Sequence, residues 1–208
     1  MTTPVLTSHR SFLVRKRTSI GAILFCVLLI LLLFVHHSWD ETSFIDFLLD
    51  ATGLLLIIMG VFGRLWCTLY IGGRKHAVLQ CEGPYCLVRH PLYVSNLLLA
   101  LGFSSLTENP VILLCVLTYF IIQYRVTIRY EETALLAKFG NAYAEYAQRV
   151  PCFLPKLRRV KLEPPTAINM PALQKELIRT AFFLMFIPAL QLVGLLHDMH
   201  LLPCISFP

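Results

Sequence analysis

The stretch FLLDATGLLLIIMGVFGRLWCTLY, residues 47–70, decides the fold of this chain. An α-helix needs about 20 consecutive apolar residues to cross the roughly 30 Å of hydrocarbon in a bilayer, and this stretch is long enough. Its two charged residues, Asp50 and Arg64, lie near its ends, so we expect both side chains to extend to the membrane surface. The stretch therefore predicts a transmembrane helix.

Four further apolar stretches predict helices that cross the membrane. They cover residues 20–35, 93–106, 111–124 and 180–196. A turn at residues 107–110 joins the second and third of them, because its Asn-Pro pair favours a change of direction. The sequence therefore predicts an all-α, polytopic membrane protein with about five transmembrane helices, two of which form a helix hairpin.

The composition of the whole chain supports this class. Of its 208 residues, 57% are apolar and 14% are charged, and the mean hydropathy is +0.69. A soluble globular protein carries about 25% charged residues, so the composition excludes that class, and it excludes disorder as well. The seven cysteines lie mostly within or beside apolar stretches, without the spacing of a zinc or redox pair. The sequence therefore predicts no disulfide framework and no metal site.

The distribution of charge predicts the orientation in the membrane. If the N-terminus is cytoplasmic, all 18 Lys and Arg residues lie on the inner side or at the inner ends of the spans. The outer loops carry Asp and Glu instead, as the positive-inside rule requires. Residues 64–92 and 125–179 are then inner segments. Prolines from residue 164 onward predict a linker, which divides the chain into a core at 1–163 and a linker with an additional C-terminal transmembrane helix at 164–208.

The two inner segments contain residue types that are unusual in so apolar a chain. The first, GPYCLVRHPLY at residues 83–93, places two tyrosines around Arg89 and His90. The second, at residues 131–151, begins with two glutamates directly after the fourth span. Each residue alone has an ordinary explanation as an interfacial anchor or an exposed cap. Together they predict a cofactor pocket that opens to the cytosol, because a helix start with basic neighbours suits an anionic group; the residues do not identify the cofactor.

These segments resemble the membrane methyltransferases typified by isoprenylcysteine carboxyl methyltransferase and by phospholipid N-methyltransferases. The resemblance covers residues 60–155, close to half of the chain, in which the motifs follow in the family's order and spacing. The matching residues are Gly83-Pro84-Tyr85, Arg89-His90-Pro91-Leu92-Tyr93, Glu131-Glu132, Leu135, Phe139-Gly140, Tyr143, Tyr146 and Val150-Pro151.

The resemblance implies an integral membrane methyltransferase that depends on S-adenosyl-L-methionine. It implies a lipophilic acceptor, such as a prenylcysteine carboxylate, a phospholipid or a thiol, and a cofactor site closed by the inner-face segments. Among the residues of this chain, it implies that Ala77, Val78, Leu79, Gln80, Tyr85, His90, Pro91, Tyr93 and Glu131 bind the cofactor. Arg89, Glu132, Arg125 and Arg129 are expected to take part in catalysis.

One departure from the family pattern leaves the acceptor open. The relatives that methylate prenylated cysteine usually have an Arg four residues before the Glu that binds the cofactor, and here that position is Thr127. Arg125 and Arg129 flank it but lie on a different face of a helix. The chain also lacks the extra N-terminal spans of the longer eukaryotic enzymes, so we expect a prokaryotic inner membrane.

Two alternative functions remain at this stage. Sterol reductases share a related core and bind NADPH, although they tend to lack the glutamate pair that Phe-Gly and two tyrosines follow. A membrane protein without catalytic activity is the second alternative, and the intact set of motif residues argues against it.

Overall fold

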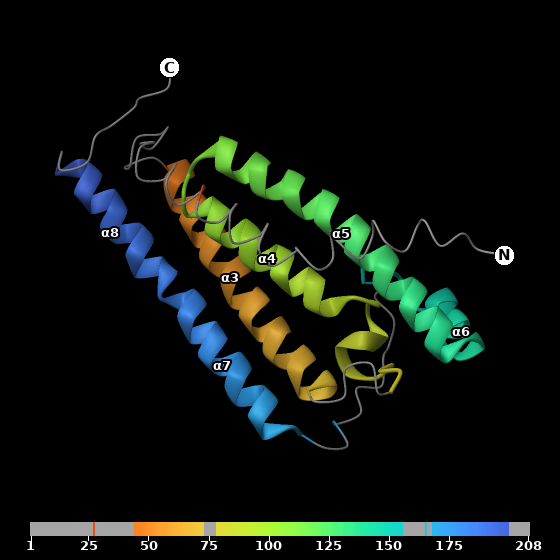
Figure 1. Cartoon of the computed structure of the whole chain (residues 1–208). Helices are drawn as coiled ribbons and strands as arrows, with labels where there is room; N and C mark the ends of the chain where they lie inside the picture. The colour runs from red at the N-terminus through yellow and green to blue at the C-terminus, as the bar shows by residue number, and fades with distance from the viewer. Residues whose placement is uncertain (1–26, 28–43, 73–77, 156–164, 166–167, 200–208) are drawn as a thin grey trace.

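The computed structural model describes residues 27, 44–72, 78–155, 165 and 168–199 (Figure 1). In this part of the chain the regular elements are all helices, which confirms the predicted all-α class. The predicted linker start and nearly all of the predicted first span lie outside the described residues, so the proposed domain boundary stays a prediction. The elements are α3 (Phe44–Ile71), the short 3₁₀ helix η1 (Gly83–Cys86), α4 (Pro91–Ser105), α5 (Pro110–Phe139), α6 (Asn141–Arg149), α7 (Met170–Leu184) and α8 (Phe186–Asp198).

Three helical stretches of the described chain are long and apolar enough to cross a membrane. They are Phe44–Ile71, Pro110–Phe139 and Met170–Leu196, with mean hydropathies of 2.1, 2.0 and 1.8. Most of their apolar side chains point outward, as expected for helices that face lipid. The remaining predicted span is the 15-residue α4, which at 1.5 Å per residue is only about 22 Å long. The chain is therefore an integral membrane protein, with one short helix inside its bundle.

Two helices extend further than the sequence predicts. The fourth span continues as α5 without a break to Phe139, well past the predicted end at residue 124. The last span begins at Met170, before the predicted start at residue 180, and its first turn is capped by Asn169. Charged residues in both extensions argue against a membrane span but not against a helix that emerges from the membrane. Pro188 explains the interruption between α7 and α8, because it has no N–H for the carbonyl of Leu184.

Small residues allow α3 and α4 to pack closely along their length. A Cβ atom added at Gly102 of α4 would lie 2.7 Å from the carbonyl oxygen of Gly53 in α3. One added at Gly60 would lie 2.9 Å from the carbonyl oxygen of Ser95. Helices inside a membrane gain stability from such close packing, since burying apolar surface gives little advantage over lipid. Ser95 itself is 4% exposed, and its hydroxyl donates to the Pro91 carbonyl.

A buried ion pair joins α3 to α7. Arg64 is 7% exposed, and its Nε donates to Oε1 of Glu176 at 2.6 Å. The Nη1 atom of the same guanidinium donates to Oδ1 of Asn96 on α4. The expectation that Arg64 extends to the membrane surface is therefore wrong. The helix that begins at Met170 covers Arg64 and supplies the carboxylate of Glu176, so the charge of the guanidinium is neutralised inside the bundle.

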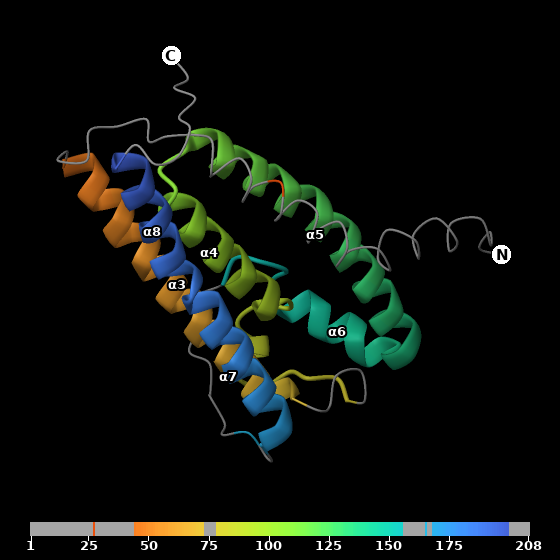
Figure 2. The ribbon, with the colours of Figure 1, turned by 60° about the vertical axis from the view of Figure 1, so that its left-hand side comes forward.

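The described residues of the two inner segments predicted from the sequence, 64–92 and 125–179, lie together at one end of the bundle. Figure 1 and the turned view in Figure 2 show the last turns of α3 beside the first turns of α4 and α7, with α6 at the far end of α5. The hairpin turn between α4 and α5 lies at the opposite end. This arrangement brings the two motif segments next to each other.

We expect Glu176→Gln to destabilise the bundle by about 3–5 kcal/mol, because it leaves the Arg64 charge buried without its counterion. The free energy of unfolding, measured by SDS titration in mixed micelles, tests this. Arg179→Gln is the matched control: it removes the other partner of Glu176, at 3.0 Å, but the Arg179 side chain is 58% exposed, so about 0–1 kcal/mol is expected. Equal losses in the two variants would contradict the importance of the buried pair.

Candidate functional site

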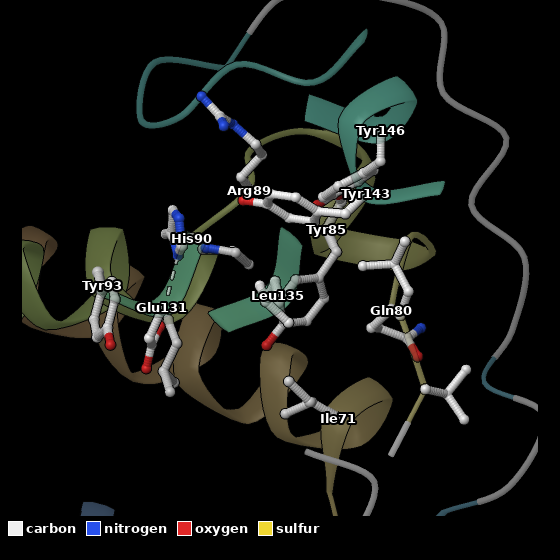
Figure 3. A pocket seen from close by; sticks show the side chains of 14 residues that line it. Ile71, Gln80, Tyr85, Arg89, His90, Tyr93, Glu131, Leu135, Tyr143 and Tyr146 are labelled. Atoms are coloured by element: carbon white, nitrogen blue, oxygen red, sulfur yellow. Dashed lines mark hydrogen bonds and ion pairs between the residues drawn. The ribbon is translucent and has the colours of Figure 1, made fainter. Parts of the chain in front are cut away.

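A pocket lies where the end of α3, the segment before α4, α5 and α6 meet (Figure 3). Every described residue that the sequence predicts to bind a cofactor lines this pocket, and so does Arg89; Ala77 lies outside the described residues. Sequence reasoning assigned no role to the other lining residues, although Leu92, Leu135, Tyr143 and Tyr146 lie within the family motifs. The pocket is lined by Ile71, Val78, Leu79, Gln80, Tyr85, Arg89, His90, Pro91, Leu92, Tyr93, Glu131, Leu135, Tyr143 and Tyr146.

The turn before α4 has its shape because of one glycine. Gly83 has φ +58°, and a Cβ atom there would meet the ring of Tyr70 in α3. Only glycine suits both the left-handed conformation and the close approach. Pro84 follows as the second residue of η1, which places Tyr85 in the wall of the pocket. The Gly-Pro-Tyr motif therefore fits a tight turn packed on the end of a span.

Helix α6 and the residues after it hold this turn in place. The hydroxyl of Tyr146 donates to the carbonyl oxygen of Tyr85 at 2.7 Å, and both residues are buried. The backbone N–H of Arg89 donates to the carbonyl oxygen of Pro151 at 2.8 Å. The chain reaches α6 through Gly140, whose φ of +54° reverses the direction after α5. The two motif segments thus form one unit.

Charged side chains from α5 surround His90. Glu132 Oε1 lies 2.7 Å from Nη1 of Arg89 and 3.3 Å from Nε2 of His90. Glu131 Oε2 lies 3.9 Å from the other ring nitrogen, Nδ1. Successive helix residues point about 100° apart, so the adjacent glutamates approach the imidazole from different sides. The ring stacks on Tyr93, with centroids 5.6 Å apart.

Burial sets the protonation of the groups in this pocket. It lowers the pKa of His90, an effect that the nearby Glu132 and Glu131 carboxylates only partly oppose. The imidazole is therefore mostly neutral at pH 7. Burial also raises the pKa of Tyr143 to about 12, and it raises the pKa values of Tyr85 and Tyr146. The tyrosines keep their protons and offer neutral rings.

Two polar atoms at the pocket are buried without a hydrogen-bond partner in the described chain. They are Nε of Arg89 and the hydroxyl of Tyr143. Such groups are costly to leave unpaired in a protein interior. Both residues line the pocket, so a polar ligand bound there could supply their partners.

Three residues of α5 that the sequence analysis singled out, Arg125, Thr127 and Arg129, do not line the pocket. Arg125 and Arg129 are exposed and do not line the pocket. Thr127, which stands at the position of the family's arginine, is 1% exposed, and its hydroxyl has no partner in the described chain. The structure therefore brings Arg89 and Glu132 together but leaves Arg125 and Arg129 apart from them, and a catalytic role for those two arginines stays a prediction.

We expect Tyr146→Phe to lower the free energy of unfolding by about 1–3 kcal/mol, because the Tyr85 carbonyl is left buried without its donor. SDS titration in mixed micelles measures this loss. Tyr130→Phe is the control, since Tyr130 is 41% exposed on α5 and should change the stability by less than about 0.5 kcal/mol. A loss of the same size in both variants would mean that the hydrogen bond does not hold the turn.

The amino-acid sequence of this chain is similar to the sequences of several known proteins. The chain is 36% identical over 188 residues to the cobalt-zinc-cadmium resistance protein CzcN of Cupriavidus metallidurans, an alignment that covers 90% of this chain and 86% of the relative. It is 36% identical to the nickel-cobalt-cadmium resistance protein NccN of Alcaligenes xylosoxydans xylosoxydans, over 84% of this chain and 81% of the relative.

A second group of relatives has a named enzymatic activity. The protein-S-isoprenylcysteine O-methyltransferase of Xenopus laevis is 32% identical, over 62% of this chain but only 55% of its own length. No solved structure matches the chain. Residues 44–137 match the model of the isoprenylcysteine carboxyl methyltransferase (ICMT) family. This match does not favour the alternative that the protein is a reductase. The chain belongs to the ICMT family and is a membrane methyltransferase.

Proposed function

We propose that this protein uses S-adenosylmethionine to methylate a lipophilic acceptor, with the cofactor entering from the cytosol and the acceptor from the bilayer. The observation that carries the proposal is the convergence of Arg89, His90 and Glu131 with four tyrosines in one pocket at the end of the bundle. The one-sided distribution of Lys and Arg supports a cytoplasmic position for that end.

The lining of the pocket suits the chemical groups of this cofactor. Tyrosine rings attract a cation over their faces, and the rings of Tyr85 and Tyr143 would suit a sulfonium. The Arg89 guanidinium, with its unpaired Nε, would hold a carboxylate near the start of α4. Glu131 would accept hydrogen bonds from an ammonium group or ribose hydroxyls. When bound, S-adenosylmethionine supplies a methyl group on a positively charged sulfur.

The chain's own part in methyl transfer is alignment and the exclusion of water. An in-line displacement at carbon needs the two reactants held in a reactive orientation, and that arrangement alone can lower the barrier by several kcal/mol. Buried tyrosines and the apolar side chains of Leu79 and Leu135 form the wall that would keep water away. Since Tyr146 and Pro151 fix the turn that carries Tyr85 and Arg89, these ligands would need little rearrangement on binding.

The charges of the pocket favour an acceptor other than a carboxylate. Arg89 is the one Lys or Arg among the described residues that line the pocket, and the cofactor's own carboxylate would engage it. In the family pattern, Thr127 occupies the position of the arginine that would meet an acceptor carboxylate. We therefore favour a lipid amine or thiol as the nucleophile.

Glu131→Gln should weaken binding of S-adenosylhomocysteine, the demethylated product, at least about tenfold, a change of about 1.4 kcal/mol, because an amide replaces the carboxylate. Titration calorimetry of the detergent-purified protein measures this, with NADPH titrated in parallel. Glu145→Gln, an exposed glutamate on α6, is the control and should bind normally. Unchanged affinity in Glu131→Gln would refute its role, and binding of NADPH alone would overturn the proposed function.

Radiolabelled S-adenosylmethionine tests the acceptor class. We expect the wild-type protein to transfer label into extracted membrane lipid, and we expect the labelled methyl group to remain non-volatile after mild alkali, as N-methyl and S-methyl groups do. Glu131→Gln provides the background. Label that alkali releases as volatile methanol would identify a methyl ester, and therefore a carboxylate acceptor.

A further inference from the structure

Three side chains with metal-binding atoms lie together at the edge of the pocket, and one of them, His90, also lines it. Each of His90, Glu132 and Cys152 offers one such atom, and the three atoms all lie within 4.8 Å of one another. They come from the start of α4, from α5 and from the segment after α6. His90 is buried, whereas Glu132 and Cys152 are half-buried. Cys152 has a free thiol. The cluster is thus at the edge of the protein interior, where an ion from solution can enter.

The chemistry of the cluster matches borderline transition-metal ions. An imidazole nitrogen, a carboxylate oxygen and a thiolate sulfur are all ligands of Zn²⁺, and the set of nitrogen and sulfur excludes Mg²⁺ and Ca²⁺, which prefer oxygen. Two ligands about 2.0–2.1 Å from a tetrahedral ion lie roughly 3.3–3.4 Å apart. His90 Nε2 and Glu132 Oε1 are 3.3 Å apart. The thiol of Cys152 would complete the set by a shift on the order of 1 Å.

The surroundings of His90 favour coordination through Nε2. Glu131 Oε2 faces the opposite ring nitrogen, Nδ1, at 3.9 Å. The closer contact is on the other side of the ring, where Glu132 Oε1 lies 3.3 Å from Nε2. Nε2 is therefore the ring nitrogen that faces the second candidate ligand, and an ion bound between the two atoms would replace their hydrogen bond. Binding of the ion would release the thiol proton of Cys152, because the thiolate is the form that ligates a metal.

We infer that His90, Glu132 and Cys152 form a binding site for a divalent transition-metal ion such as Zn²⁺ or Co²⁺, with the fourth coordination position open to water. The inference does not depend on the proposed methyl transfer. The sequence alone predicts no metal site, because the three ligands have no motif spacing and meet only through the fold.

Arg89 would compete with a metal ion for the carboxylate of Glu132. Its Nη1 lies 2.7 Å from Oε1 of Glu132, the same oxygen that faces His90. The guanidinium neutralises this carboxylate in the metal-free protein, and an incoming cation must displace it. The Arg89 side chain is 19% exposed, so it can turn toward water. Removing its charge should therefore strengthen metal binding, whereas removing a ligand should weaken it.

Cobalt titration of the full-length, tag-free protein in detergent tests the site. We expect Co²⁺ to produce a thiolate-to-cobalt charge-transfer band that Zn²⁺ abolishes by displacement. Cys152→Ser should remove the band, whereas Cys115→Ser, which alters an exposed cysteine on α5, should keep it. Glu132→Gln should weaken cobalt binding at least about tenfold, and Arg89→Gln should strengthen it by a similar factor.

Two results would overturn the inference. One is a band that persists in Cys152→Ser, which would place the bound cobalt at other cysteines. The other is an affinity that falls or stays unchanged in Arg89→Gln, which would mean that Glu132 is not a ligand. Because Arg89→Gln is expected to gain affinity, a general loss of folded protein cannot imitate the expected result. The thermal unfolding midpoint of each variant is measured alongside.

Discussion

The buried ion pair between Arg64 and Glu176 is the constraint on which the arrangement of the helices depends. In a lipid environment apolar side chains gain little by leaving the membrane for the protein, so packing and polar contacts decide which helices meet. Arg64 contacts Asn96 on α4 and Glu176 on α7, which ties three helices at one depth. The pocket begins two turns further along α3, at Ile71, so this contact also fixes the floor of the site.

The rigidity of α5 determines how the charges of the site are placed. The helix continues from the turn at Asn109 to Phe139, beyond the length needed to cross the hydrocarbon. Its last turns carry Glu131 and Glu132 to the beginning of α4, where His90 and Arg89 lie. A continuous helix resists bending, so the distance between these charges is set by the packing of α5 against α4. The acidic pair therefore needs no loop to position it.

The site has two parts with different physical properties. Buried tyrosines and apolar side chains form an inner wall, whose neutral rings suit an organic cation. The cluster of Arg89, His90 and Glu132 lies at the edge, where carboxylate and guanidinium neutralise each other and remain partly accessible. A polar ligand, or a metal ion, can replace one partner of such a pair without leaving the other in an apolar environment. The Arg89–Glu132 ion pair would open in this way when a carboxylate binds Arg89, and also when a metal ion binds Glu132.

The sequence by itself determined the membrane class and the helical fold, and its resemblance to a known family pointed to most of the residues that line the pocket. Apolar length predicts a span without reference to other segments, and the pocket residues from Val78 to Tyr93 are close enough in the chain for a turn and a helix start to orient them. The tertiary structure decided the rest. The partner of Arg64, the full length of α5 and the separation of Arg125 and Arg129 from the pocket depend on which helix covers which face. Neither periodicity nor composition records that choice, because an uncompensated charge and a paired charge look the same in a sequence.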